Sequence, residues 1–224
     1  MRRGRVFNFL QTRFRGKRFA EVDRLLRAIV AAKGSATVLD AGGRAQYWEM
    51  LDADLRDKVS IVCLNFSDEL DLYDTEASTL QVENAVGDAC NMPQYGDGSF
   101  DLVHSNSVIE HVGSLQNMGK FASEVRRVGK AYYVQTPNFW FPIEPHYGVP
   151  LLHWLPSAAR MRVFTSMSVG FAKKCDFDGA LVRIDHTQMV SVFMMRNFFS
   201  DGTLIRERFA LLTKSITMMR SYPA

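Results

Sequence analysis

The sequence predicts a single α/β domain built on a doubly wound sheet of seven strands, mostly parallel, with an antiparallel hairpin at the C-terminal edge. Two patterns predict it. Short apolar runs alternate with helical periodicities along the chain, which is typical of a parallel sheet covered by helices. The last two apolar runs are separated only by a tight turn, which favours an antiparallel pair. The 224 residues suit one domain, and 47% hydrophobic residues can form a sizeable core.

The first predicted element is a helix over residues 18–33, where apolar side chains recur every three or four positions and Gly34 is a candidate C-cap. A short buried strand follows at 37–40, then the turn Ala41-Gly42-Gly43 and a helical stretch to Leu55. The further predicted elements are strands 59–64, 82–86, 100–105 and 130–135, helices 118–128, 157–170 and 185–197, and the hairpin strands 203–210 and 214–220.

Charge and cysteine content exclude several classes of protein. The net charge of +3 is too small for a dedicated nucleic-acid-binding protein. Cys63, Cys90 and Cys175 are far apart and form no C-x-x-C pair, which argues against a disulfide framework and a structural zinc site. No apolar run approaches the roughly 18 residues of a membrane span, and the N-terminus lacks the pattern of a secretory signal. We therefore expect a cytoplasmic protein.

The positive charge is concentrated at the N-terminus. Basic residues alternate there with aromatic and aliphatic ones; they are Arg2, Arg3, Arg5, Arg13, Arg15, Lys17 and Arg18. Such a segment can make a peripheral contact with an anionic membrane or receive an acidic substrate. The interpretation that we favour is a solvated helix face whose phenylalanines pack on the domain.

The turn after the first strand carries the clearest functional signal. Glycines at a strand-to-helix turn let backbone N–H groups approach a ligand closely. Asp40 precedes them, and its carboxylate would repel a pyrophosphate but suit a cationic ligand such as S-adenosylmethionine. The G-x-G-x-x-G fingerprint of dinucleotide-binding proteins is absent after Gly42, which argues against a nicotinamide-dependent oxidoreductase.

Three later stretches resemble the central block of class I S-adenosylmethionine-dependent methyltransferases, and most closely the small ubiquinone/menaquinone-biosynthesis-like enzymes. They are residues 87–93, 97–103 and 105–112, and the resemblance extends over residues 36–138. It implies a Rossmann-like fold, S-adenosylmethionine as cofactor and no metal. It also divides the single domain 1–224 into a basic helical segment 1–33, a cofactor-binding core 36–138 and an acceptor-side segment 139–224.

The resemblance implies a role for each residue at the strand ends. The methionine part of the cofactor would be held by Asp40, Ala41, Gly42 and Gly43. Asp88 would accept from the adenine amino group beside the backbone of Ala89, and Ser105 with Asn106 would form the floor near the methyl group.

The sequence departs from the family pattern at two places. Asn65 replaces the usual ribose-binding acid, so it can hydrogen-bond the diol but loses the strength of a charged acceptor. Asp68 or Glu69 could compensate from the following turn. Arg44 stands where the family usually has a further glycine, and it could pair with the cofactor carboxylate.

Two places could supply a general base for the acceptor. His111 follows the fourth strand, where it is either a base or a packing histidine. Glu144 and His146 lie in a loop rich in prolines and aromatics after the fifth strand, and a carboxylate beside an imidazole can form a base with its orienting partner. The alternative is that Glu144 only ties down the loop.

The sequence therefore predicts a methyltransferase acting on a small molecule, most readily at a hydroxyl oxygen of a sugar, glycoconjugate or secondary metabolite. The alternative is a nucleoside-binding accessory or regulatory protein of the same fold without turnover. No nucleic-acid partner is expected, and the residues do not determine the oligomeric state.

Overall fold

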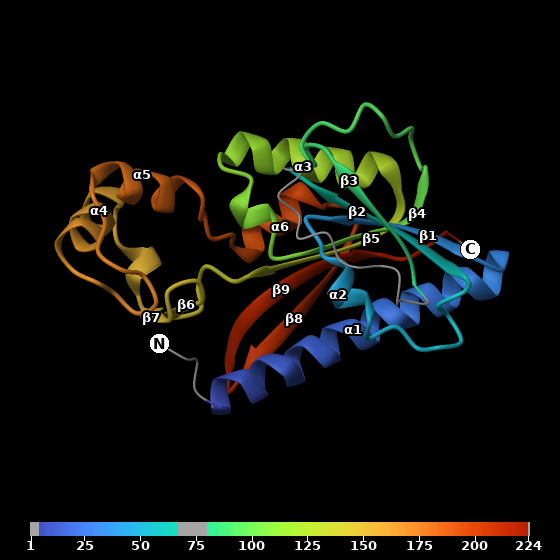
Figure 1. Ribbon diagram of the computed structural model, residues 1–224, viewed down its shortest axis with the longest axis horizontal. Coiled ribbons are helices and arrows are strands. Elements are labelled where there is room, and N and C mark those ends of the chain that lie inside the picture. Colours follow the sequence, from blue (N-terminus) through green and yellow to red (C-terminus); the bar gives the residue numbers. More distant parts are fainter. Residues whose placement is uncertain (1–4, 67–79, 224) are drawn as a thin grey trace. The chain divides into compact units, whose positions relative to one another are not determined.

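The computed structural model describes residues 5–66 and 80–223, with side chains from residue 14 onward (Figure 1). The helices are α1 (Arg5–Lys33), α2 (Ala45–Trp48), η2 (Ile109–His111), α3 (Leu115–Val128), η3 (Leu152–Trp154), α4 (Ser157–Ser166), α5 (Phe177–Asp185) and α6 (Val192–Phe198). The strands are β1 (Ala36–Ala41), β2 (Val59–Asn65), β3 (Gln81–Val86), β4 (Phe100–Asn106), β5 (Gly129–Pro137), β6 (Ile143–Glu144), β7 (Val149–Pro150), β8 (Thr203–Phe209) and β9 (Leu212–Arg220). Within these ranges no helix is long and apolar enough to cross a bilayer.

Seven strands form one sheet in the order β3-β2-β1-β4-β5-β9-β8. β1 pairs in parallel with β2 and with β4, and β2 pairs in parallel with β3. Only residues 210–211 separate the neighbours β8 and β9, so these two strands run antiparallel at the sheet edge. The predicted seven-stranded, mostly parallel sheet with a C-terminal edge hairpin is confirmed.

The chain divides into two compact units. Unit 1 comprises residues 1–106, 123–134 and 219–224, and unit 2 comprises residues 107–122 and 135–218. This division does not follow the three segments predicted from the sequence, and the prediction of a single domain stays a prediction.

Unit 1 is built around buried strands. β1 and β4 are buried at all but one position each, and their buried positions include the polar residues Asp40, Asp101, His104 and Ser105. The apolar side of α1 is also buried, as its periodicity predicts; its buried residues are Phe19, Val22, Leu25, Leu26 and Ile29. Gly34 ends this helix with a φ of +86°, the left-handed conformation that a glycine C-cap supplies.

The basic residues at the described end of the N-terminal segment contact their own unit. The Arg15 guanidinium lies 5.3 Å from the centre of the Tyr47 ring, and Arg18 donates to Asn106 Oδ1 at 3.4 Å. These contacts support the packing interpretation for this part of the segment. Arg2 and Arg3 lie outside the described residues, so the predicted membrane contact stays a prediction.

Unit 2 has a small core of its own between α4 and α5. Its buried residues are Leu152, Phe164, Ala172, Ala180 and Ile184. β6 and β7 form an antiparallel hairpin beside η3, in the segment whose prolines suggest a loop. Asp176 caps α5 by accepting from Gly179 N, and Ser191 caps α6 by accepting from Met194 N.

Several helix boundaries differ from the prediction. α3 begins at Leu115 rather than at residue 118, and α4 ends at Ser166 rather than at residue 170. α1 begins at Arg5 rather than at residue 18. The stretch after the glycine turn is a single helical turn, α2. Its backbone then continues in i→i+3 turns to Leu55 instead of a regular helix. The predicted helix 185–197 is interrupted, since Gln188 N donates to Glu110 O instead of continuing the helical ladder.

Candidate active site

Polar and glycine residues meet at one edge of the sheet in unit 1. β3, β2, β1 and β4 are neighbours that run in parallel, so their carboxyl ends lie on the same edge. The glycine turn follows β1, Asn65 ends β2, Asp88 follows β3, and Ser105 with Asn106 ends β4. The structure thus brings all the predicted cofactor-binding residues to one edge, where ligands bind in sheets of this type.

The carboxylate of Asp40 is buried and already bonded. It is 1% exposed, its Oδ2 accepts from Trp48 Nε1 at 2.8 Å, and its Oδ1 lies 2.7 Å from His104 Nδ1. His104 is equally buried, and its ring stacks on Tyr47 with centroids 4.7 Å apart. Asp40 therefore fixes α2 and β4 around the glycine turn, while its predicted contact with a ligand's ammonium group stays a prediction.

Both glycines of the turn are required, each for a different reason. Gly42 has a φ of +77°, and its N–H donates to Leu64 O at 2.7 Å. A Cβ on Gly43 would lie 1.7 Å from Asp40 Oδ2, far inside any real contact. The backbone of the turn therefore packs directly against the buried Asp40 carboxylate, which only glycine at position 43 allows.

The structure explains why an amide stands at position 65. Asn65 Nδ2 donates to Gly43 O at 2.9 Å and braces the glycine turn. An ionised carboxylate has no proton to donate there and would face a carbonyl oxygen. The side-chain oxygen of Asn65 can still accept from a ribose hydroxyl. Asp68 and Glu69, predicted to compensate for the missing acid, lie outside the described residues.

The other strand-end residues divide between structural and exposed positions. Ser105 is buried, and its hydroxyl donates to Ala41 O at 3.0 Å, so the hydroxyl supports the turn from below. Asp88 is exposed, and its Oδ1 accepts from Cys90 N at 2.8 Å. The backbone between these partners includes Ala89, which is half-buried.

Unit 2 brings together the residues predicted as catalytic. His146 Nδ1 lies 2.5 Å from Glu144 Oε1, and Tyr147 N donates to Glu144 Oε2 at 2.6 Å. Glu144 is 2% exposed. Burial acts to raise its pKa, but the hydrogen bonds from His146 and Tyr147 outweigh burial and hold the pKa below its usual range. Glu144 orients the imidazole as well as tying down the loop.

His111 joins this pair from η2, which precedes α3. Its ring meets the His146 ring edge-to-face with centroids 4.7 Å apart, and its Nδ1 lies 2.6 Å from His186 O. The residue before it, Glu110, is fully buried and is absent from the predicted site residues. Thr136 Oγ1 donates to Glu110 Oε2 at 2.9 Å, and burial raises the pKa of Glu110. No sequence periodicity marks Glu110 as buried, because η2 is a single turn.

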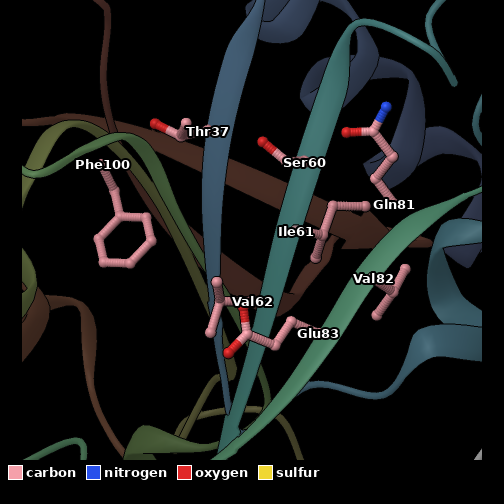
Figure 2. Close-up of a pocket in the computed structure, with 8 residues that line it drawn as sticks. All are labelled: Thr37, Ser60, Ile61, Val62, Gln81, Val82, Glu83 and Phe100. Atoms are coloured by element: carbon pink, nitrogen blue, oxygen red, sulfur yellow. The ribbon is translucent and has the colours of Figure 1, made fainter.

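The hollow shown in Figure 2 is not this site. It has a volume of about 330 Å³ and lies over the amino-terminal halves of β1 to β3, at Thr37, Ser60 and Gln81, beside the start of β4. The predicted residues lie at the opposite, carboxyl ends of these strands. A second hollow, in unit 2 behind Glu144, has only about 10 Å³, roughly the space of one water molecule.

Part of the sequence matches a known protein family. Residues 39–131 match a family model described as a methyltransferase domain. An uncharacterized protein of Mycobacterium tuberculosis, Rv1509, is 37% identical over 51 residues, which are 23% of this chain and 17% of that protein. The chain thus spans about a sixth of the length of the curated relatives it matches.

Solved structures resemble most of the chain in fold, at low sequence identity. A possible exported protein from Bordetella parapertussis has a TM-score of 0.60 at 16% identity, covering 93% of this chain and 67% of its own. Protein PH0226 from Pyrococcus horikoshii has a TM-score of 0.55 at 14% identity, covering 92% and 91%. A SAM-dependent methyltransferase from Methanosarcina mazei has a TM-score of 0.50 at 15% identity, covering 83% and 91%. At these identities the likeness is one of fold, and none of it selects the ubiquinone/menaquinone subgroup.

Proposed function

We propose that this chain is a class I S-adenosylmethionine-dependent methyltransferase and that it transfers a methyl group to a hydroxyl oxygen of a small molecule such as a sugar, glycoconjugate or secondary metabolite. The observation that carries the acceptor chemistry is the His146 imidazole, which Glu144 orients through Nδ1. A hydroxyl must lose its proton to become a methyl ether, and an oriented imidazole is a suitable base.

The residues at the sheet edge fit S-adenosylmethionine. The Asp40 carboxylate occupies the space that a Cβ on Gly43 would fill, so its negative charge lies directly against the backbone of the glycine turn. We expect Asn65 to bind the ribose through its side-chain oxygen, and the exposed Asp88 to accept from the adenine amino group. Asp40 would act through its negative charge, since both of its oxygens already bind protein donors.

The bound cofactor supplies an electrophilic methyl group, and the protein supplies alignment and a proton acceptor. In the transfer, the acceptor oxygen forms a bond to the methyl carbon while the carbon–sulfur bond breaks, and its electron pair stays on sulfur. His146 Nε2 takes the hydroxyl proton, because Nδ1 donates to Glu144. Glu144 then stabilises the imidazolium that forms, as its lowered pKa keeps it ionised.

The acceptor is expected to carry negative charge. Arg18 reaches the end of β4 at Asn106, beside the predicted cofactor-binding edge. A guanidinium at that place favours an anionic group such as a carboxylate or phosphate. Matched pairs of acceptors with and without such a group would test this preference in the transfer assay.

The test separates cofactor binding from methyl transfer. Calorimetry with S-adenosylhomocysteine measures binding, and a radiolabelled-methyl assay against hydroxylated acceptors measures transfer. We expect His146→Ala to bind the cofactor like the wild type and to lose transfer by about 10²–10⁴-fold. Asp185→Asn, which changes an exposed acid of the same unit, is the control.

Full transfer by His146→Ala would remove the imidazole from the mechanism. Binding without transfer to any acceptor would favour the second candidate, a nucleoside-binding accessory or regulatory protein. The internal use of Asp40 and Ser105 favours that candidate, because it leaves fewer side chains to engage the reacting end of the cofactor.

A further inference from the structure

We propose that Glu110, His111 and His146 form a binding site for one first-row divalent transition-metal ion, such as Zn²⁺, Co²⁺ or Mn²⁺. One ligand atom from each residue lies within 4.8 Å of the others. Two imidazoles and a carboxylate are a donor set that such ions bind well. The sequence predicts no metal, so this site is an addition from the structure.

The first observation is a buried carboxylate with an unused oxygen. Glu110 is 0% exposed, and its Oε2 accepts from Thr136. Its Oε1 is buried and has no hydrogen-bond partner in the part of the chain that the structure describes. A buried carboxylate is costly unless it is paired or coordinates a metal. A cation between Glu110 and the two histidines would remove that cost.

The second observation is that both imidazoles are oriented as metal ligands are. Metal-binding histidines usually donate their other ring N–H to a carboxylate or a backbone carbonyl. His146 Nδ1 does so to Glu144 Oε1, and His111 Nδ1 to His186 O. In each ring the hydrogen bond through Nδ1 leaves the lone pair on Nε2.

The surrounding backbone holds the three residues in place. Gln188 N donates to Glu110 O at 2.8 Å, and His111 N donates to Val108 O at 2.7 Å. Ligand atoms around a tetrahedral zinc ion lie about 3.4 Å apart, given bonds of about 2.1 Å. Closing the site from 4.8 Å therefore needs movements of about 1.4 Å, within reach of side-chain rotation at the half-buried His146 and the exposed His111.

Three protein ligands leave coordination positions open. His111 is exposed, so water or an acceptor hydroxyl can reach the ion. A metal ion lowers the pKa of a bound hydroxyl group, so a bound ion would activate the acceptor in place of the His146 base, whose Nε2 lone pair it occupies. This role rests on the proposed function, whereas metal binding itself does not.

The test begins with full-length chain stripped of metal by a chelator. Titration with Zn²⁺ by calorimetry is expected to show one ion per chain, and titration with Co²⁺ is expected to give the visible absorption of a nitrogen- and oxygen-bound ion. Glu110→Gln and His146→Ala should each weaken Zn²⁺ binding at least 10-fold. Glu144→Gln, which changes only the orienting partner, should weaken it about 10–100-fold.

Asp185→Asn is the matched control, because it removes an exposed acid of the same unit and should leave the affinity unchanged. Circular dichroism and S-adenosylhomocysteine binding verify that each variant is folded. The proposal is overturned if the wild type binds no stoichiometric ion, or if Glu110→Gln and His146→Ala, both folded, bind Zn²⁺ as the wild type does. Stoichiometric binding lost in both variants supports it, whatever the transfer assay shows.

Discussion

Replacing Gly43 by alanine tests the close packing of the glycine turn on the Asp40 carboxylate. The added Cβ would lie 1.7 Å from Asp40 Oδ2 and 1.8 Å from Cγ, whereas ordinary contacts begin at 3.4 Å. The carboxylate must therefore move by about 1.7 Å, the difference between these two distances. Such a movement breaks its hydrogen bonds to Trp48 at 2.8 Å and to His104 at 2.7 Å, in a place that is 1% exposed.

The expected cost follows from those two bonds. Hydrogen bonds to a charged group contribute about 1.5–3 kcal/mol each, so Gly43→Ala should lower the free energy of unfolding by about 3–6 kcal/mol. Urea unfolding with linear extrapolation measures it. Gly16→Ala is the control, because nothing lies within 4 Å of a Cβ there and alanine should stabilise α1 by about 1 kcal/mol. A loss below about 1 kcal/mol for Gly43→Ala would refute the reasoning, since the carboxylate would then not be pinned beneath the turn.

Two further predictions concern Asn65 and Asp101. Asn65→Asp should weaken S-adenosylhomocysteine binding about 10-fold in calorimetry, because the carboxylate cannot donate to Gly43 O; unchanged or tighter binding would contradict the bracing role. Burial acts to raise the pKa of Asp101, but hydrogen bonds from Lys33, Thr37 and Lys130 hold it at about 2. Because this pKa is lowered, its stabilisation is present above about pH 4 and is lost as the pH falls toward 2. Since both lysines are more than a third exposed, we expect the ionised Asp101 to contribute only about 1–2 kcal/mol to the free energy of unfolding. Urea unfolding at a series of pH values measures this contribution, and Asp101→Asn should show a flatter pH dependence than the wild type.

The central strands could be predicted because β1 and β4 are buried at nearly every position, whereas the edge strands β3 and β8 are mostly exposed. The positions of the strand ends then placed the glycine turn, Asn65 and Asp88 on one edge. The pairing of Glu144 with His146 was also accessible, because only one residue separates them.

The contacts that define the site chemically could not be predicted, because they join residues far apart in the chain. Asp40 meets His104 across 64 residues, and Thr136 meets Glu110 across 26. No local pattern indicates that Asp40 is saturated by protein donors or that Glu110 is buried.

β5 and β9 each contribute residues to both units: β5 passes from one to the other after Val134, and β9 passes back after Met218. Unit 1 is therefore assembled from three separate stretches of sequence and unit 2 from two. No single cut of the polypeptide yields either unit intact, so gene fragments are unsuitable for dissecting this protein. Point substitutions in the full chain are the appropriate tool for assigning roles to its parts.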